Sequence, residues 1–195
     1  AGCCGAVRFH LNDHETAKND MRRNIDAWWP HIEAGVEAIV VTASGCGVQV
    51  RDYGHILADD TLYAEKAAKI SSLSRDPSEV LAGEKAALLP LLAARPERRG
   101  KLAFHSPCTL QHGLQIRGSI EVLLQSAGYD LTPVADSHLC CGSAGTYSVL
   151  QPELAGMLRA NKLAALNAGG PALAATANIG CLTHLQAGSS LPVRH

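Results

Sequence analysis

The stretch His138-Leu139-Cys140-Cys141-Gly142-Ser143-Ala144-Gly145 has a counterpart in the first residues of the chain, Gly2-Cys3-Cys4-Gly5-Ala6. In both places two adjacent cysteines precede a glycine, and a helical pattern, a short strand pattern and one more cysteine follow. That later cysteine is Cys46 in the first half and Cys181 in the second. Self-similarity of this kind indicates an internal repeat, so we expect two related cysteine-rich units.

Apolar spacing predicts helices that alternate with strands. A helix is expected through Ala17, Met21, Ile25, Trp28 and Ile32, with Pro30 as the point where it kinks or ends. Further helices are expected over 62–73, 80–92, 116–127 and after Pro152, and strands over 36–42, 101–105, 129–134 and 172–176. Alternation of this kind favours an α/β fold with mostly parallel strands and right-handed crossovers.

The repeat divides the chain into three stretches. We expect the first cysteine-rich unit over 1–75, a linker helix with a solvated basic turn over 76–100, and the second unit over 101–195. The second half has a leading cysteine, Cys108, for which the first half has no counterpart. We therefore expect the first repeat to be truncated at its N-terminal side.

Composition excludes several classes of protein. The formal charge is −1, with 17 Lys+Arg against 18 Asp+Glu, which disfavours a nucleic-acid binder that neutralises phosphates. No apolar run approaches the roughly 20 residues of a membrane-spanning helix. The sequence does not open with a basic and then apolar signal segment. These features predict a cytoplasmic protein that does not span a membrane.

The seven cysteines predict metal ligands rather than a disulfide framework. Seven is odd, and adjacent cysteines are poorly placed to bridge each other. Four positions, at Cys46, Cys108, Cys140-Cys141 and Cys181, come just after predicted strands, and all of them except Cys108 lie in glycine-rich loops. Open α/β sheets bind ligands beyond the carboxyl ends of their strands, so we expect the thiols to gather there.

Four thiolates select either zinc or an iron–sulfur cluster. Cys108, Cys140, Cys141 and Cys181 supply the usual number of ligands for a [4Fe–4S] cluster, which we favour over zinc because zinc sites prefer ligand pairs spaced two to four apart. Cys3, Cys4 and Cys46 are the candidate ligands of the first half. Thiol–disulfide catalysis is disfavoured because no Cys-x-x-Cys motif is present.

Five strings carry a resemblance to a known family over essentially the whole chain. They lie at 23–30, 42–47, 104–112, 138–147 and 177–181, and the paired Cys-Cys-Gly motifs are their most specific part. The chain resembles the duplicated cysteine-rich redox proteins, which include the heterodisulfide reductase B subunit and the lactate-utilisation iron–sulfur protein. It is most similar within this group to the iron–sulfur subunits of bacterial glycolate oxidase.

The resemblance implies a subunit that carries electrons from a flavin subunit oxidising glycolate toward a membrane acceptor. It also implies a ferredoxin-like N-terminal region with clusters of its own, and a cytoplasmic location or attachment to the inner face of the membrane. No residues here suit hydride abstraction, and no flavin-binding fingerprint is present, so the chain is expected to be non-catalytic. The alternative is a zinc-stabilised docking scaffold in a complex that oxidises lactate or another 2-hydroxy acid.

The chain departs from the heterodisulfide reductase relatives at one position in each half. Their closing motif, Cys-x-x-Cys, has its second cysteine replaced here by Gln49 and by His184. A five-cysteine cluster therefore cannot be carried over, and His184 becomes a candidate extra ligand or hydrogen-bond donor. His105, His112 and His138 also flank the cysteines, either as donors to a cluster or as loop histidines bonded to backbone.

Overall fold

The computed structural model describes residues 1–94 and 99–195. The chain separates into two compact units, Ala1–Pro77 and Ser78–His195, and each is described by itself. Of the predicted 76–100 linker, the described part forms two helices, α6 (Pro77–Gly83) and α7 (Lys85–Ala93), and the first residue of a strand. Most of its predicted basic turn, 95–98, lies outside the described residues.

The first unit is mainly helical. Its helices are α1 (Ala6–His10), α2 (His14–Glu33), α3 (Ser44–Arg51), α4 (Tyr53–Ile56) and α5 (Ala64–Leu73). The helix expected through Ala17, Met21 and Ile25 is confirmed as α2, and these three side chains are fully buried. Pro30 does not end this helix, which continues to Glu33.

Two short parallel strands complete the first unit, β1 (Ile39–Val40) and β2 (Ser74–Arg75). The strand expected over 36–42 is thus shorter than predicted, because its partner is only two residues long. Val36 and Val40 are exposed, so the apolar run that suggested a buried strand is not buried on both faces.

The second unit is built on a four-stranded parallel sheet in the order β4-β3-β5-β6. The strands are β3 (Gly100–His105), β4 (Tyr129–Leu131), β5 (Leu173–Thr176) and β6 (Val193–Arg194). Besides α6 and α7, the helices are η1 (Thr109–Gly113), α8 (Ser119–Ser126), α9 (Tyr147–Leu150), α10 (Pro152–Asn167) and α11 (Ile179–Gln186). The expected parallel α/β architecture is confirmed.

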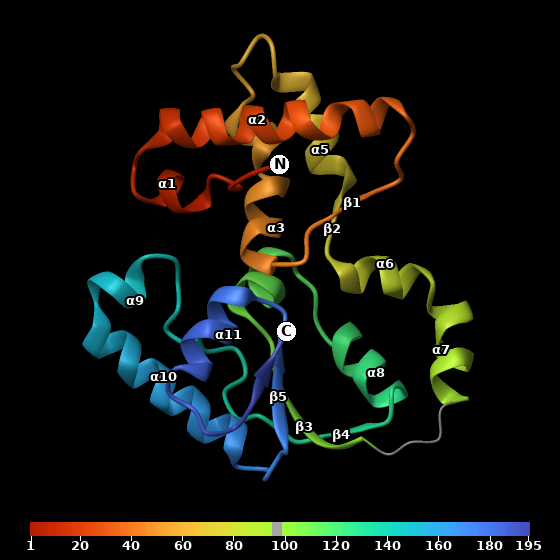
Figure 1. The fold of residues 1–195 in the computed structure, drawn as a ribbon, viewed down its shortest axis with the longest axis vertical. Coiled ribbons are helices and arrows are strands. Elements are labelled where there is room, and N and C mark those ends of the chain that lie inside the picture. The colour runs from red at the N-terminus through yellow and green to blue at the C-terminus, as the bar shows by residue number, and fades with distance from the viewer. Residues whose placement is uncertain (95–98) are drawn as a thin grey trace. The chain divides into compact units, whose positions relative to one another are not determined.

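The connections of this sheet place helices on both of its faces. The chain leaves β3 through α8 to β4 at one edge, then crosses back through α10 to β5 on the other side of β3. Right-handed crossovers in opposite directions put their helices on opposite faces. Figure 1 shows this arrangement, with α10 and α11 on one side of the strands and α8 on the other. The strand order therefore reverses between β3 and β5, whose carboxyl ends form the topological switch point.

The core of the second unit reaches this switch point. Buried side chains of α10 and α11, including Leu163, Leu166 and Leu185, pack against Ala103 and Ala174 of the sheet. Cys141 and Cys181 belong to the same buried cluster. No helix among the described residues is both long enough and apolar enough to cross a membrane.

Candidate metal centre

Three separate segments bring four cysteines to the switch point of the second unit. Cys108 follows β3 and is the N-cap residue of η1, and Cys181 follows β5 in the first turn of α11. Cys140 and Cys141 lie in the long loop between β4 and α9. Because β3 and β5 are parallel neighbours, the segments that follow them start side by side.

The four thiols form one continuous cluster. Hydrogen bonds join Cys108 to Cys140, Cys140 to Cys141, and Cys141 to Cys181. All four are free thiols, and Cys141 and Cys181 are buried, with exposed fractions of 1% and 6%. The structure thus brings together the four residues that the sequence analysis grouped.

These hydrogen bonds polarise the cluster. Bonds accepted from Cys108 and then Cys141 lower the pKa of Cys140, and the N–H of Gly142, 3.3 Å from its sulfur, acts in the same direction. The same bonds, together with burial, raise the pKa of Cys108 and Cys141. A thiolate at Cys140 is therefore stabilised by two neighbouring thiols, whose protons a bound metal would displace.

His105, the last residue of β3, lies against this cluster. One of its ring nitrogens and the sulfurs of Cys141 and Cys181 all lie within 4.8 Å of one another. Its Nδ1 is 3.1 Å from Oγ1 of Thr176, whereas its Nε2 is buried without a hydrogen-bond partner among the described residues. Burial, and then the charge of Lys162, lowers the pKa of His105 to about 4, so the imidazole is neutral near pH 7.

Lys162 of α10 is a buried cation beside the same cluster, with an exposed fraction of 3%. Its ammonium donates hydrogen bonds to the carbonyl oxygens of Asp136, at 2.8 Å, and Ser137, at 3.5 Å. Among the described residues no carboxylate lies within 4.0 Å of it. Burial lowers the pKa of Lys162, and the nearest opposing negative charges come from Cys141, Asp136, Cys140 and Cys181.

The sequence analysis did not single out Lys162, although a signal was available. Lys162 follows Ala155 by two helical turns and adjoins Leu163, so it occupies the buried face of α10. A lysine in a core-facing register is uncommon unless an anionic partner compensates its charge.

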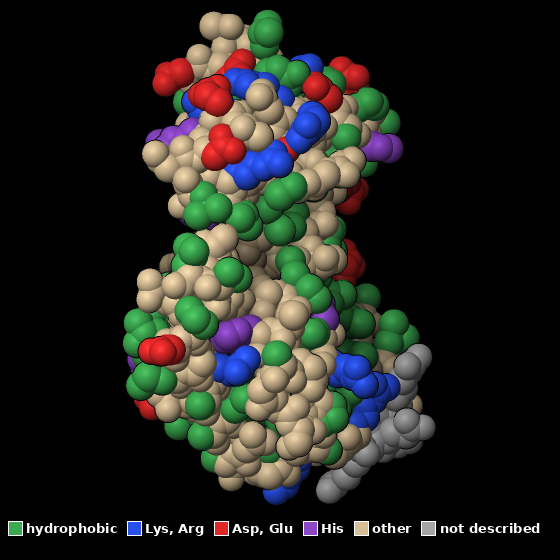
Figure 2. Space-filling model, turned by 60° about the vertical axis from the view of Figure 1, so that its left-hand side comes forward, with side chains coloured by type: hydrophobic (Ala, Val, Ile, Leu, Met, Phe, Trp, Pro, Cys, Tyr) green, Lys and Arg blue, Asp and Glu red, His purple; other side chains and the backbone are tan. Residues whose placement is uncertain are grey.

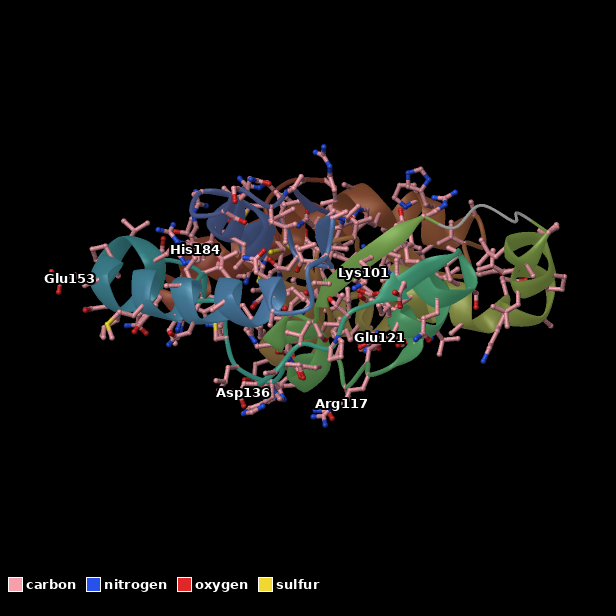
Figure 3. All side chains as sticks on the ribbon, turned by 90° about the horizontal axis from the view of Figure 1, so that it is seen from below. Lys101, Arg117, Glu121, Asp136, Glu153 and His184 are labelled. Carbon is pink, nitrogen blue, oxygen red and sulfur yellow. The ribbon has the colours of Figure 1, made fainter. Side chains whose placement is uncertain are left out.

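His184, a candidate extra ligand or hydrogen-bond donor, is directed elsewhere. Its Nε2 lies 3.3 Å from the carbonyl oxygen of Ala155, and Figure 3 shows it on α11 beside α10. It does not belong to the group of ligand atoms that includes His105, Cys141 and Cys181. His112 is likewise turned to backbone, with its Nε2 3.3 Å from the carbonyl oxygen of His138.

The first unit repeats part of this geometry with Cys3, Cys4 and Cys46. The sulfurs of Cys4 and Cys46 are 3.2 Å apart. The N–H of Gly5 lies 3.5 Å from the sulfur of Cys3, and the N–H of Gly142 lies 3.3 Å from that of Cys140. The shared hydrogen bond raises the pKa of Cys4 and lowers that of Cys46 to about 7. Cys46 is the third residue of α3, and Cys181 is the third residue of α11.

Two buried polar residues hold the backbone of the first cysteine pair. Asn24 Nδ2 donates to the carbonyl oxygen of Cys3 at 2.8 Å, and the Tyr53 hydroxyl donates to that of Cys4 at 2.9 Å. Asn24 also donates to the Tyr53 oxygen at 3.2 Å. Gln49 is buried in the same unit, and its Nε2 has no partner among the described residues.

The donor set of the second unit suits a thiolate-ligated metal centre. Four thiols converge there, and all-thiolate sites select zinc or iron–sulfur clusters. The buried ammonium of Lys162 is stabilised further when neighbouring thiols ionise, which is the state that metal binding requires. The residues present therefore fit such a group.

Hydrophobic side chains also reach the surface of both units, as Figure 2 shows. In the second unit the exposed set includes residues of α9, α10 and the cysteine loop, namely Leu139, Val149, Leu150, Leu154 and Met157. Nothing in the structure shows what covers them.

The chain is similar to a family of cysteine-rich proteins. The CCG cysteine-rich domain matches residues 1–51 and 102–186, one segment in each unit. The glycolate oxidase iron-sulfur subunit of Escherichia coli is 54% identical over the whole chain, which covers 47% of that protein. The probable glycolate oxidase iron-sulfur subunit of Bacillus subtilis is 31% identical over 95% of the chain and 41% of that protein.

A more distant relative is matched over most of its own length. Lactate utilization protein A of Shouchella clausii is 24% identical over 99% of the chain and 80% of that protein. The chain thus spans less than half of the two glycolate oxidase subunits. The two segments of the domain match are consistent with the repeat seen in the sequence.

Proposed function

The chain belongs to the CCG cysteine-rich domain family, and from this premise we propose that it is the iron–sulfur electron-transfer part of a glycolate-oxidising complex. In this proposal electrons come from flavin-containing subunits and leave toward a membrane acceptor. The chain itself neither binds glycolate nor takes hydride from it. A cytoplasmic location, with attachment to the inner face of the membrane through partners, belongs to the same proposal.

One observation supports this function most directly. Cys108, Cys140, Cys141 and Cys181 come from three separate segments and form a single hydrogen-bonded cluster at the switch point of a parallel sheet. Four such thiolates are the usual ligands of a [4Fe–4S] cluster, which when bound would supply one-electron transfer.

The chain's own residues would prepare and enclose the ligands. The Gly142 N–H stabilises negative charge on Cys140, and the side chain of Asn178 caps α11, accepting hydrogen bonds from the N–H groups of Gly180 and Cys181. Burial of Cys141 and Cys181 limits access of water, which favours cluster stability and helps to set its potential.

The first unit is proposed to hold a second site through Cys3, Cys4 and Cys46. Three cysteines leave one position to another donor, so a complete cluster there would need a ligand from elsewhere in a longer polypeptide. The glycolate oxidase relatives are about twice as long as this chain. A ferredoxin-like region with its own clusters is proposed for that additional length.

A single zinc ion is the second candidate, because one geometric feature favours it. A ring nitrogen of His105 with the sulfurs of Cys141 and Cys181 is a compact mixed donor set, within 4.8 Å, of the type that zinc accepts. The chain would then be a docking scaffold in an oxidase of glycolate, lactate or another 2-hydroxy acid.

Metal analysis of anaerobically purified protein distinguishes these functions. We expect iron and acid-labile sulfide in equal amounts, with an EPR signal after reduction. Cys141→Ser should remove the signal of the second site, whereas Cys3→Ser should leave it intact. Zinc without sulfide would refute the electron-transfer function and support the scaffold.

The place of the chain in the complex can be tested in the assembled oxidase. Glycolate should still reduce the flavin when Cys141→Ser is present, but electrons should no longer reach an acceptor dye that depends on the clusters. Replacing glycolate by lactate in the same assay identifies the preferred substrate. Loss of flavin reduction in the correctly assembled variant would place this chain in the active site instead.

A further inference from the structure

The two repeats correspond at the glycine of each Cys-Cys-Gly turn. A Cβ built on Gly5 would lie 3.0 Å from the carbonyl oxygen of Ala17 in α2. A Cβ built on Gly142 would lie 2.5 Å from that of Ala155 in α10. Each Cys-Cys-Gly turn therefore packs against one particular carbonyl of the long helix that follows it, which makes Ala17 and Ala155 equivalent positions.

Two turns further along each helix, the equivalent residues are Asn24 and Lys162. Both are buried, with exposed fractions of 1% and 3%. Asn24 donates to the carbonyl of Cys3 and Lys162 donates to that of Asp136, in the loop that leads to Cys140. The two residues thus share a position and a backbone-holding role but differ by one positive charge.

The charge on Lys162 acts on three thiols of its own unit, those of Cys140, Cys141 and Cys181. Its ammonium has no carboxylate within 4.0 Å among the described residues, and its hydrogen bonds go to backbone oxygens. The other nearby titratable groups are the exposed carboxylate of Asp136 and the buried imidazole of His105. In this surrounding a fixed cation acts on the cysteine cluster with little screening.

We propose that Lys162 raises the reduction potential of the site formed by Cys108, Cys140, Cys141 and Cys181, whereas Asn24 gives no such increase to the first unit. This inference rests on the proposed iron–sulfur function. Reduction adds one electron to the cluster, and a buried cation stabilises the added negative charge. Electrons entering the chain would therefore collect at the second site. Lys162 acts on the cluster through its charge and is not a ligand.

Substitutions at Lys162 separate its charge from its hydrogen bonds. Lys162→Gln keeps an N–H donor but removes the charge, Lys162→Met removes both, and Lys162→Arg keeps both. Lys101→Gln is the matched control, because Lys101 is an exposed lysine at the start of β3, labelled in Figure 3. The measurement is a dye-mediated anaerobic reductive titration followed by EPR, together with iron and sulfide content.

The expected result is a shift to more negative midpoint potential in Lys162→Gln and Lys162→Met, with Lys162→Arg and Lys101→Gln close to wild type. Equal potentials in wild type and an iron-loaded Lys162→Gln protein would overturn the inference. Wild-type protein without iron and sulfide would instead refute the proposed function.

Failure of a variant to assemble is also informative. If both neutral variants lose the cluster and Lys162→Arg retains it, the positive charge is required and the inference is supported. If Lys162→Arg also loses it, the side chain has a packing role and the inference fails.

Discussion

Nδ1 of His105 lies 3.1 Å from Oγ1 of Thr176, and the two residues are register partners at the carboxyl ends of β3 and β5. The bond joins the two strands at the place where the strand order reverses. Because both residues are buried, water cannot replace either partner. The bond also fixes the ring of His105 beside Cys141 and Cys181, so it links the sheet directly to the candidate metal centre.

Thr176→Val is predicted to destabilise the second unit. Valine has a similar shape but leaves Nδ1 of His105 buried without a partner, at a cost of about 1–3 kcal/mol. Thr183→Val on α11 is the control, because Thr183 is exposed and its hydroxyl donates to the nearby carbonyl of Ile179. Urea unfolding of the metal-free protein, followed by circular dichroism, measures both. Equal stability of the two variants would contradict the structural role of this bond.

Acidification is predicted to destabilise the second unit through His105. Burial lowers its pKa from the ordinary 6.5 to about 4, so the unfolded chain binds the proton more tightly. The resulting stabilisation is present above pH 6.5 and is lost as the pH falls from 6.5 to about 4. The loss amounts to about 3 kcal/mol, and His105→Gln should remove this part of the pH dependence.

Urea unfolding at several pH values between 4 and 7 tests this difference. Both tryptophans, Trp28 and Trp29, belong to the first unit, so their fluorescence serves as an internal reference that His105 should not affect. His55→Gln, at an exposed histidine of the first unit, is the control. An identical pH profile in wild type and His105→Gln would show that the buried imidazole is not the source.

Much of the fold could be predicted from local patterns. Pro152 opens α10 as expected, and strands expected over 101–105 and 172–176 appear as β3 and β5. The two-residue strand β2 and the edge strand β6 could not be predicted, because such short strands are defined by their pairing partners. A single helix expected over 80–92 is two helices, α6 and α7.

The site could be predicted in part. The grouping of Cys108, Cys140, Cys141 and Cys181 depends only on the rule that the segments after parallel strands meet, and the structure brings them together. The difference between His105 and His184 could not be predicted, because both lie close to cysteines in sequence. The register of β3 directs His105 inward to Thr176. The packing of α11 on α10 directs His184 to the carbonyl oxygen of Ala155.

Gly142→Ala is predicted to disrupt the cysteine loop. Gly142 has a φ of 92°, and an added Cβ would lie 2.5 Å from the carbonyl oxygen of Ala155. Gly145→Ala is the matched control, because Gly145 also has a positive φ, 60°, but has open space around it. The control should lose about 1 kcal/mol from backbone strain alone. Gly142→Ala should lose more than about 2 kcal/mol and should also lower the iron content, since Cys140 and Cys141 would move. Equal losses in urea unfolding would show that the close approach to α10 is unimportant.

Metal binding to the second unit is predicted to release protons and to strengthen as the pH rises. The raised pKa values of Cys108 and Cys141 keep these thiols protonated near pH 7, and each must lose its proton to become a ligand. In a protein with Cys3, Cys4 and Cys46 changed to serine, Cd²⁺ binding should release protons from this pair, and the affinity should rise about tenfold per pH unit for each thiol that must lose its proton. An indicator dye in weakly buffered solution measures the protons. Cys108→Ser in the same background should release about one proton fewer.

An affinity that is independent of pH would mean that the thiols are already ionised before metal binds. That result would contradict the hydrogen-bonded thiol cluster of the structure.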